Sequence, residues 1–465
     1  MDFRTESVIN LAKKVEDKEI SPSELVQFAL DKIEELNPKI NAFIAVDGDF
    51  ALSEARELDK SIARGDLPGP LAGIPIGVKD MEDAKNFVTS KGSALFASTP
   101  KQKDDSILVS RLKSAGCIVV GKTNTPELAW KADTVNSTFG PTLNPWNTLY
   151  SPGGSSGGSA AAVSSGMVPL ATGSDGGGSL RIPSAACGIS AFKPSLGRIP
   201  AGGSSPPEWH DLSTKGVMAK SLNDIVAVID CVVGPDPSDL YSLPTPDATW
   251  VGALNDAHVA NSIAYSTNLG YADVDSEIVE ICDRAVEVLV ELGANADSVE
   301  GIFDEDPIND WLSQVAVYSW NALEPYADSP EFELVDELLK SLSLWGKTLT
   351  ASDLKKSQDQ GHIMNLKLVN LFHHYRLLVT PTVAGHYPLS NGLGTINGVQ
   401  DINWVKFTYP FNLTRSPVAT VPIGFTNAGL PISLQIIGPQ HGDQVVIRTA
   451  YSLEKALENN KVAPC

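Results

Sequence analysis

Histidine is scarce in this 465-residue sequence and absent from its first 209 positions. The seven histidines are His210, His258, His362, His373, His374, His386 and His441. Histidine is the side chain that most often serves an enzyme as a general base. A catalytic site built from the first 200 residues would therefore need a different base.

Cysteine is also rare. The chain has five cysteines, which lie far apart and include no CxxC pair: Cys117, Cys187, Cys231, Cys282 and Cys465. A disulfide framework or a cysteine-ligated metal would need paired, regular spacing. We therefore expect reduced thiols and no metal site.

Long apolar runs and an excess of positive charge are missing as well. No stretch of about 18 uncharged apolar residues could cross a membrane, and the acidic N-terminus MDFRTESVIN lacks a signal-peptide core. The net charge of −21 argues against a nucleic-acid ligand, because clustered Lys and Arg bind phosphate backbones. The sequence predicts a soluble cytoplasmic protein that binds neither nucleic acid nor membrane.

Strand and helix patterns alternate in the first half of the chain. PLAGIPIGVKD predicts a buried strand that ends at Lys79, residues 105–116 an amphipathic helix, and residues 117–123 a second buried strand. This order predicts an α/β fold with parallel strand pairing. An earlier helix begins with a capping box at Ser21 and is expected to close at Pro38.

No shift in composition marks a domain boundary. We interpret residues 1–465 as a single domain, with a core at about 71–200. A mostly helical region at about 300–376 is expected to shape a substrate pocket. The stretch 200–210 is expected to be an exposed loop.

Three consecutive glycines occur in residues 172–184, TGSDGGGSLRIPS, directly before Ser179. Each glycine loses more backbone entropy on folding than any other residue, so a run of three needs a reason. A second glycine-flanked serine site, SPGGSSGG, lies at 151–158. These two sites are the strongest candidates for chemistry.

Two other motifs suggest different functions and are disfavoured. GCIVVGKT at 116–123 fits the phosphate-loop pattern, but its apolar, β-branched interior predicts a strand instead of an anion-binding loop. The pairs Ser110–Lys113 and Ser190–Lys193 match the SxxK motif of penicillin-recognising enzymes. The SDN and KTG motifs that should follow are missing from their expected places.

The order of the remaining motifs resembles the amidase signature family over nearly the whole chain. The matching stretches include GIPIGVKD, GCIVVGKTNTPELAW, FGPTLNPWN, the region 151–200 and PFNLTRSPVATVPIGFTNAGLPISLQIIG. The resemblance implies an α/β fold of three layers, in which helices cover both faces of a central, mixed, twisted β-sheet. The alternative is that the glycines only form surface loops.

The same resemblance implies a Ser–cisSer–Lys triad that needs no metal and no cofactor. Ser179 would be the nucleophile, Ser155 the proton relay and Lys79 the base. A lysine is a base only when neutral, and burial lowers its pKa from about 10.4. The apolar run before Lys79 suits this requirement. The alternative is that Lys79 pairs at the surface with a nearby acid: Asp80, Glu82 or Asp83.

The glycine run is implied to form an oxyanion hole. Acyl transfer places negative charge on the carbonyl oxygen, and backbone N–H groups have to converge on it. The expected donors are the N–H groups of Gly176, Gly177, Gly178 and Ser179. The residues expected to fix the loop and the serines are Ser156, Asp175 and Arg181.

The sequence departs from the family's usual pattern in three places, and at residues 191–195 it reads AFKPS instead of the usual GLKPT. The other two departures are single residues. Gly176 stands where a threonine or another side chain is common, and Arg415 where a small residue is common. We expect the missing side chain at Gly176 to widen the site for a bulkier acyl group. Arg415 is expected either to shape the acyl or leaving-group pocket or to be a solvated charge.

The resemblance implies a free-standing amidase that acts on a small-molecule amide with water, and possible substrates extend to aryl amides, esters and carbamates. The chain would be a monomer or a homodimer. The alternative is the glutaminase subunit of a tRNA-dependent amidotransferase, which usually has RQP after its serine where residues 181–183 read RIP. A catalytically inactive relative is disfavoured because all three triad residues are present.

The pocket walls are expected to come from residues 126–140, 200–212, 306–345 and 385–410. These segments hold several aromatic side chains: Trp130, Phe139, Trp209, Tyr318, Trp320 and Trp404. They favour an aromatic or apolar substrate, and the alternative is that they pack in the core.

Overall fold

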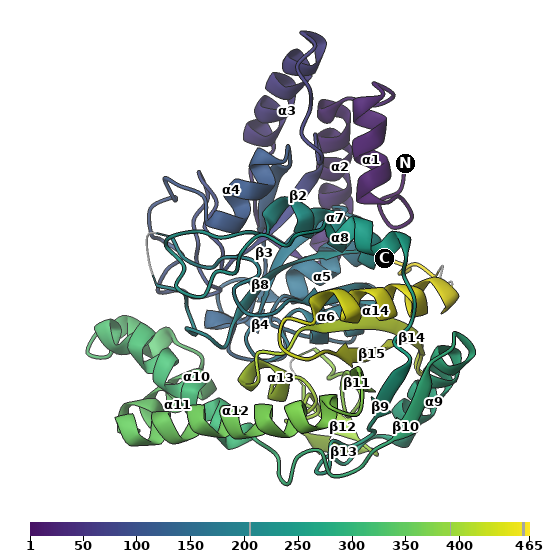
Figure 1. The fold of residues 1–465 in the computed structure, drawn as a ribbon. Coiled ribbons are helices and arrows are strands. Elements are labelled where there is room, and N and C mark those ends of the chain that lie inside the picture. The colour runs from purple at the N-terminus through teal and green to yellow at the C-terminus, as the bar shows by residue number, and fades with distance from the viewer. Residues whose placement is uncertain (204–205, 391, 458–460) are drawn as a thin grey trace.

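An eleven-stranded mixed β-sheet forms the centre of the protein (Figure 1). The structure is a computed structural model that describes residues 1–203, 206–390, 392–457 and 461–465. The strand order is β1-β3-β2-β6-β8-β7-β14-β15-β11-β9-β10. The strands of this sheet are β1 (Phe43–Val46), β2 (Pro75–Lys79), β3 (Ile118–Thr123), β6 (Leu170–Asp175), β7 (Ser190–Lys193), β8 (Thr214–Ala219), β9 (Ser262–Tyr265), β10 (Asn295–Ser298), β11 (Leu377–Pro381), β14 (Val418–Phe425) and β15 (Pro431–Ile437).

Helices flank this sheet, which confirms the predicted α/β fold (Figure 1). The α-helices are α1 (Val8–Glu16), α2 (Pro22–Ile40), α3 (Gly48–Ala63), α4 (Ile107–Ser114), α5 (Gly157–Ser164), α6 (Arg181–Cys187), α7 (Leu222–Val232), α8 (Trp250–Asn255), α9 (Ser276–Glu291), α10 (Ile308–Leu323), α11 (Glu337–Thr348), α12 (Ala351–Phe372), α13 (Pro410–Leu413) and α14 (Asp443–Leu457). The described residues also form short 3-10 helices, η1 (Glu127–Ala129), η2 (Glu324–Tyr326) and η3 (Pro330–Leu334). Two small two-stranded sheets pair β4 (Val135–Asn136) with β5 (Gly140–Pro141) and β12 (Gly394–Ile396) with β13 (Val399–Asp401).

The parallel unit expected in the first half of the chain is present. Strands β2 and β3 pair in parallel, with α4 between them in sequence, and β2 also pairs in parallel with β6. Strand β6 then pairs antiparallel with β8. This arrangement brings Lys79, the last residue of β2, beside the C-terminal half of β6, where the glycine run begins.

One helix boundary differs from the prediction. Ser21 forms the expected capping box with Glu24, but helix α2 does not close at Pro38. It continues to Ile40 and ends at Asn41, which adopts the left-handed conformation (φ 56°) and donates its N–H to Asn37 O. A proline removes only one backbone donor, so the last turn can pass through it.

A single large hydrophobic cluster runs through the sheet and its flanking helices, from Phe3 to Leu453. A smaller cluster joins Leu128 of η1 to Leu323, Phe332 and Leu339 of the helical region. This second cluster attaches helices α10 and α11 to the loop after β3. The interpretation of residues 1–465 as one domain stays a prediction.

Candidate active site

Lys79 is fully buried at the end of β2 and contacts two serines. Its Nζ donates to Ser155 Oγ at 2.9 Å and to Ser174 Oγ at 3.0 Å, and its backbone N–H donates to Thr172 Oγ1 at 2.9 Å. Ser174 and Thr172 lie on β6, the parallel neighbour of β2. The pairing of these strands therefore sets the position of the lysine.

Burial, followed by the positive charge of Lys215, lowers the pKa of Lys79 to about 7. The alternative, a surface pair with a nearby acid, is wrong. Asp80 accepts from the N–H groups of Ser90 and Gly92 and lies 3.4 Å from the ammonium of the buried Lys122. Glu82 pairs instead with Lys215. Lys79 is therefore held by hydroxyl groups, which do not oppose its neutral form.

The two predicted serines come from segments on either side of β6. Ser155 precedes α5, is almost fully buried, and follows a cis peptide bond from Gly154. Ser179 lies between the end of β6 and the start of α6 and is half-buried. Both line one small cavity of about 20 Å³ with Ser174, Gly176 and Trp209. Among the described residues the hydroxyls of Ser155 and Ser179 form no direct hydrogen bond with each other, and the cavity has room for about one water molecule.

The carbonyl groups of the glycine run are all anchored. Asn412 Nδ2 donates to Asp175 O at 2.8 Å, Trp311 Nε1 to Gly176 O at 2.8 Å, and Thr408 Oγ1 to Gly177 O at 2.6 Å. The N–H of Ile182 in α6 donates to Gly178 O at 2.7 Å. In a trans peptide the N–H points away from the carbonyl. Fixing these four carbonyls therefore fixes the direction of the four following N–H groups.

Three of these four N–H groups have no partner in the described part of the chain: those of Gly176, Gly177 and Ser179. The prediction that Gly178 N–H is a free oxyanion-hole donor is wrong, since this N–H donates to Asp175 Oδ1 at 2.8 Å. The carboxylate at the end of β6 thus occupies this donor before any substrate oxygen could. The loop can therefore offer three unpaired N–H donors, not four.

Asp175 and Arg181 form a fully buried ion pair behind this loop, with an Nη2–Oδ1 distance of 2.9 Å. Burial would raise the pKa of Asp175, but the guanidinium and the hydrogen bonds to its oxygens hold that pKa well below its usual range. Asp175 also accepts from Leu180 N–H, and Arg181 donates to Asn412 and Thr408. Both residues lie where they would stiffen the loop.

Ser156 lies between the two serine sites. Its N–H donates to Ser179 O at 3.3 Å, and its Oγ donates to Ser174 O at 3.4 Å. It therefore ties the segment before α5 to β6 and to the residue after the glycines. Ser156, Asp175 and Arg181 all contact the loop, as expected for supporting residues.

The two disfavoured motifs do not form sites. The phosphate-loop pattern at 116–123 lies mainly in the buried strand β3, and Lys122 Nζ donates to Glu82 O and to Thr89 Oγ1. Ser190 donates its hydroxyl to Glu454, not to Lys193. Ser110 and Lys113 lie on α4.

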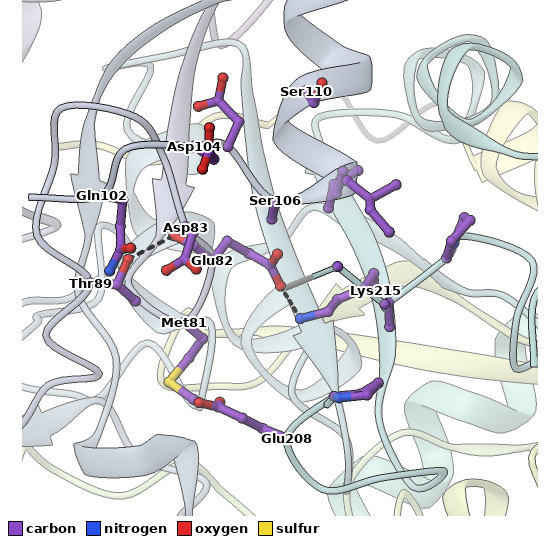
Figure 2. A pocket seen from close by; sticks show the side chains of 18 of the residues that line it. Met81, Glu82, Asp83, Thr89, Gln102, Asp104, Ser106, Ser110, Glu208 and Lys215 are labelled. Carbon is purple, nitrogen blue, oxygen red and sulfur yellow. Dashed lines mark hydrogen bonds and ion pairs between the residues drawn. The ribbon is translucent and has the colours of Figure 1, made fainter. Parts of the chain in front are cut away.

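A cavity of about 800 Å³ adjoins the small one, and the two share Met81, Glu208 and Lys215 as wall residues. Figure 2 shows Glu82 and Lys215 joined by their ion pair in this cavity, with Met81 and Glu208 at its lower edge. Its walls come from residues 81–111 and 200–215, together with Asp236, and carry many charged side chains. Of the expected wall segments, 200–212 lines these two cavities and 126–140 contributes Ala129 to the small one, although Ser204 and Ser205 lie outside the described residues. The described residues of 306–345 and 385–410 line neither cavity.

The expected aromatic lining is mostly wrong for these two cavities. Of the six aromatic residues named from sequence, Trp209 lines the small cavity, while Trp404 is buried against Tyr387 and Trp320 stacks with Lys347. The charged wall at 81–111 was not predicted from the sequence, because its mixture of charged and apolar residues is also typical of a surface loop and an amphipathic helix. The loop anchors Trp311, Thr408 and Asn412 were also missed, since each is more than 130 residues from the glycines.

Among the described residues, no group of three or more His, Cys, Asp or Glu is placed to hold a metal ion. All five cysteines are free. In the same described part of the chain, no helix combines the length and the apolar run that a bilayer crossing requires. The site as built contains serine hydroxyls, the amine of Lys79 beside them, backbone N–H groups, and the charged side chains of Glu208 and Lys215 at the wall that it shares with the large cavity.

Comparison with known proteins gives one consistent result. The family model described as Amidase matches residues 24–447. An acylamidase of Rhodococcus erythropolis is 32% identical over 96% of this chain and 94% of its own length. A crystal structure of a bacterial aryl acylamidase of the amidase signature family superposes with a TM-score of 0.90, at 29% identity over 97% of this chain and 96% of that one. A glutamyl-tRNA(Gln) amidotransferase subunit from Thermotoga maritima superposes with a TM-score of 0.75, at 27% identity over 98% and 95% of the two chains.

Proposed function

This chain belongs to the amidase signature family of hydrolases, which act on the C–N bonds of amides, and on that premise we propose that it does so through a serine acyl-enzyme. The nucleophile is Ser179, the proton relay is Ser155 and the base is Lys79. The observation that carries the proposal is the buried contact of Lys79 Nζ with Ser155 Oγ at 2.9 Å, beside the cavity that Ser179 lines.

The first step is attack of Ser179 Oγ on the carbonyl carbon of the amide. The hydroxyl proton of Ser179 passes to Ser155, and the proton of Ser155 passes to Lys79. Lys79 can accept it because burial lowers the pKa of its amine to about 7, so a large fraction is neutral near pH 7. The N–H groups of Gly176, Gly177 and Ser179 then stabilise the oxyanion.

Collapse of the tetrahedral intermediate breaks the C–N bond. The leaving nitrogen takes a proton from Ser155, which Lys79 resupplies, and an ester on Ser179 remains. Water attacks this ester with the same relay acting as base, and the carboxylic acid leaves. One amide and one water thus give one acid and one amine, and the protein residues return to their starting protonation states.

The relatives suggest where the substrate search should begin. A similar acylamidase and a similar aryl acylamidase support N-acyl amines, including acylated aryl amines, as the first compounds to assay. The charged wall of the large cavity also supports amides with a polar amine half. The apolar substrate suggested by the aromatic residues has less support, because only Trp209 of that set lines the small cavity.

The alternative function is the glutaminase subunit of a tRNA-dependent amidotransferase. The sequence RIP after Ser179 and the lower TM-score to that subunit both favour the free-standing enzyme. The test is an assay of the purified chain alone against a panel of amides, with release of amine or ammonia as the readout. Hydrolysis without a partner supports the proposal, whereas activity on glutamine that requires added partner subunits would contradict it.

A further inference from the structure

The space over Gly176 is filled by a side chain of the protein itself. A Cβ atom built on Gly176 would lie 2.5 Å from Cε3 of Trp209 and 3.0 Å from its Cζ3. Real Cβ atoms do not approach ring carbons so closely, so any side chain here would push the ring away. The expectation that Gly176 widens the site for a bulkier acyl group is therefore wrong. The glycine makes room for an indole ring.

A second tryptophan supports this ring from behind. Trp311 packs edge-on against Trp209 with ring centroids 5.9 Å apart, and its Cζ2 would lie 2.4 Å from a Cβ built on Gly177. Trp311 also donates Nε1–H to Gly176 O at 2.8 Å and stacks on Tyr409 at 5.7 Å. One indole ring therefore packs against each of the first two glycines of the run.

Ion pairs hold the loop that carries Trp209, one before and one after this residue in sequence. Glu208 forms an ion pair with Lys91, and Asp211 forms one with Arg415. Trp209 and His210 both have positive φ, at 58° and 46°, a conformation that residues with a Cβ seldom adopt. Arg415, whose role was open from sequence, thus holds the Trp209 loop. These contacts give the ring one defined position over the glycines.

From this geometry we propose that Trp209 is a specificity-determining residue that restricts the acyl half of the substrate to small groups. The inference rests on the proposed function. The leaving amine has to lie beside Ser155, from which it takes its proton. Trp209 stands against Gly176 on the oxyanion loop, so the ring bounds the space for the other substituent of the carbonyl. With the ring in place, the small cavity holds only about 20 Å³.

The amine half of the substrate meets no such restriction. The cavity of about 800 Å³ that shares Met81, Glu208 and Lys215 with the small one can take a large amine. The two halves of the substrate should therefore respond differently to the loss of the ring. Acyl selectivity should change strongly, and amine selectivity should change little.

The experiment measures kcat/KM for anilides whose acyl group grows from acetyl to butyryl to benzoyl. Trp209→Ala should raise the butyryl/acetyl and benzoyl/acetyl ratios by about tenfold or more, as expected when a pocket gains room for several carbon atoms. Trp209→Phe should give an intermediate ratio. A second series keeps the acetyl group and varies the amine, and its ratios should stay close to those of the unmodified chain.

Trp345→Ala is the matched control, because Trp345 is exposed on α11 and lines neither cavity. A reciprocal variant, Gly176→Ala, should lower activity because its methyl group collides with the ring. In the Trp209→Ala background the same methyl group should cost much less, and a double-mutant cycle measures this coupling.

The outcomes separate the two proposals. If the unmodified chain hydrolyses amides and the acyl ratios of folded Trp209→Ala and Trp209→Phe equal those of the control, the inference is overturned and the proposed function stands. A larger change in the amine series than in the acyl series would also overturn it. If no variant and no unmodified chain cleaves any amide, the proposed function fails, and the inference fails with it.

Discussion

Two lysines at strand ends are equally buried but have different neighbours. Lys79 ends β2 and Lys193 ends β7, and both are fully enclosed. Burial lowers the pKa of each to about 7, with Lys215 adding to the effect at Lys79 and Arg181 at Lys193. Lys79 contacts two serine hydroxyls, whereas the one hydrogen bond of Lys193 Nζ within the described residues goes to Pro194 O at 3.3 Å.

A lowered pKa does not by itself make a base, because the amine also has to lie within reach of the group whose proton it takes. Lys193 also has a nearby serine in sequence, Ser190, which could suggest a catalytic pair. That serine donates its hydroxyl to Glu454 instead. A base in a hydrolase also needs a hydroxyl group within hydrogen-bond distance, and that hydroxyl has to face a cavity. Of the two lysines, Lys79 has such a partner in Ser155. Substitutions of Ser179 and Ser190, and of Lys79 and Lys193, test this difference.

The largest effect is expected at the nucleophile. Ser179→Ala should lower kcat for amide hydrolysis by about 10⁴-fold or more, because the acyl-enzyme can no longer form. Ser190→Ala is the matched control and should keep activity close to that of the unmodified chain. Steady-state amine release measures both, and comparable loss in the two variants would contradict the assignment.

The next effect is expected at the base. Lys79→Met should lower kcat/KM by about 10²- to 10⁴-fold, the range expected for a general base. Lys193→Met removes an equally buried amine that donates to no serine in the described part of the chain, so its effect should be far smaller. Circular dichroism of both variants establishes that they are folded. If Lys193→Met were the more damaging of two folded variants, the comparison between the lysines would be wrong.

The smallest effect concerns stability at Lys193. Its pKa is about 7 in the folded chain and about 10.4 when unfolded, so between these values the unfolded chain binds one proton more. The free energy of unfolding therefore rises with pH by about 1.4 kcal/mol per pH unit for each such lysine. This contribution is present above the unfolded pKa and is lost as the pH falls to the folded pKa.

Lys193→Met removes one such contribution. Urea denaturation between about pH 7.5 and pH 9 should show stability rising less steeply with pH for the variant than for the unmodified chain. Parallel curves would mean that Lys193 does not titrate as its burial implies.

Local signals in the sequence were sufficient for the elements that carry the proposed triad. The apolar run before Lys79 predicted a strand end, and the capping box at Ser21 predicted a helix start, because both patterns depend on neighbouring residues. The glycine run likewise predicted a close approach to the backbone. The resemblance to the amidase signature family implied that Lys79 and Ser155 act together, and the structure places them in contact although 76 residues separate them.

The parts that could not be predicted depend on contacts across the whole chain. Nothing near Gly176 in sequence indicates that Trp209 would fill the space above it, or that Trp311 would hold its carbonyl. The loss of Gly178 as an oxyanion donor depends on where Asp175 turns its carboxylate, which Arg181 and Asn412 decide. Such outcomes follow from packing, so they needed the structure.

The most direct test of the account is the pH dependence of covalent labelling at Ser179. An alkyl fluorophosphonate is added to the unmodified chain and to Lys193→Met between about pH 5.5 and pH 8.5, and mass spectrometry locates the adduct. If Lys79 is the base, an adduct forms on Ser179 in both chains, at a rate that rises with pH through an apparent pKa of about 7 as Lys79 becomes neutral. An adduct on another residue, or a rate at Ser179 that does not change with pH, would contradict the account.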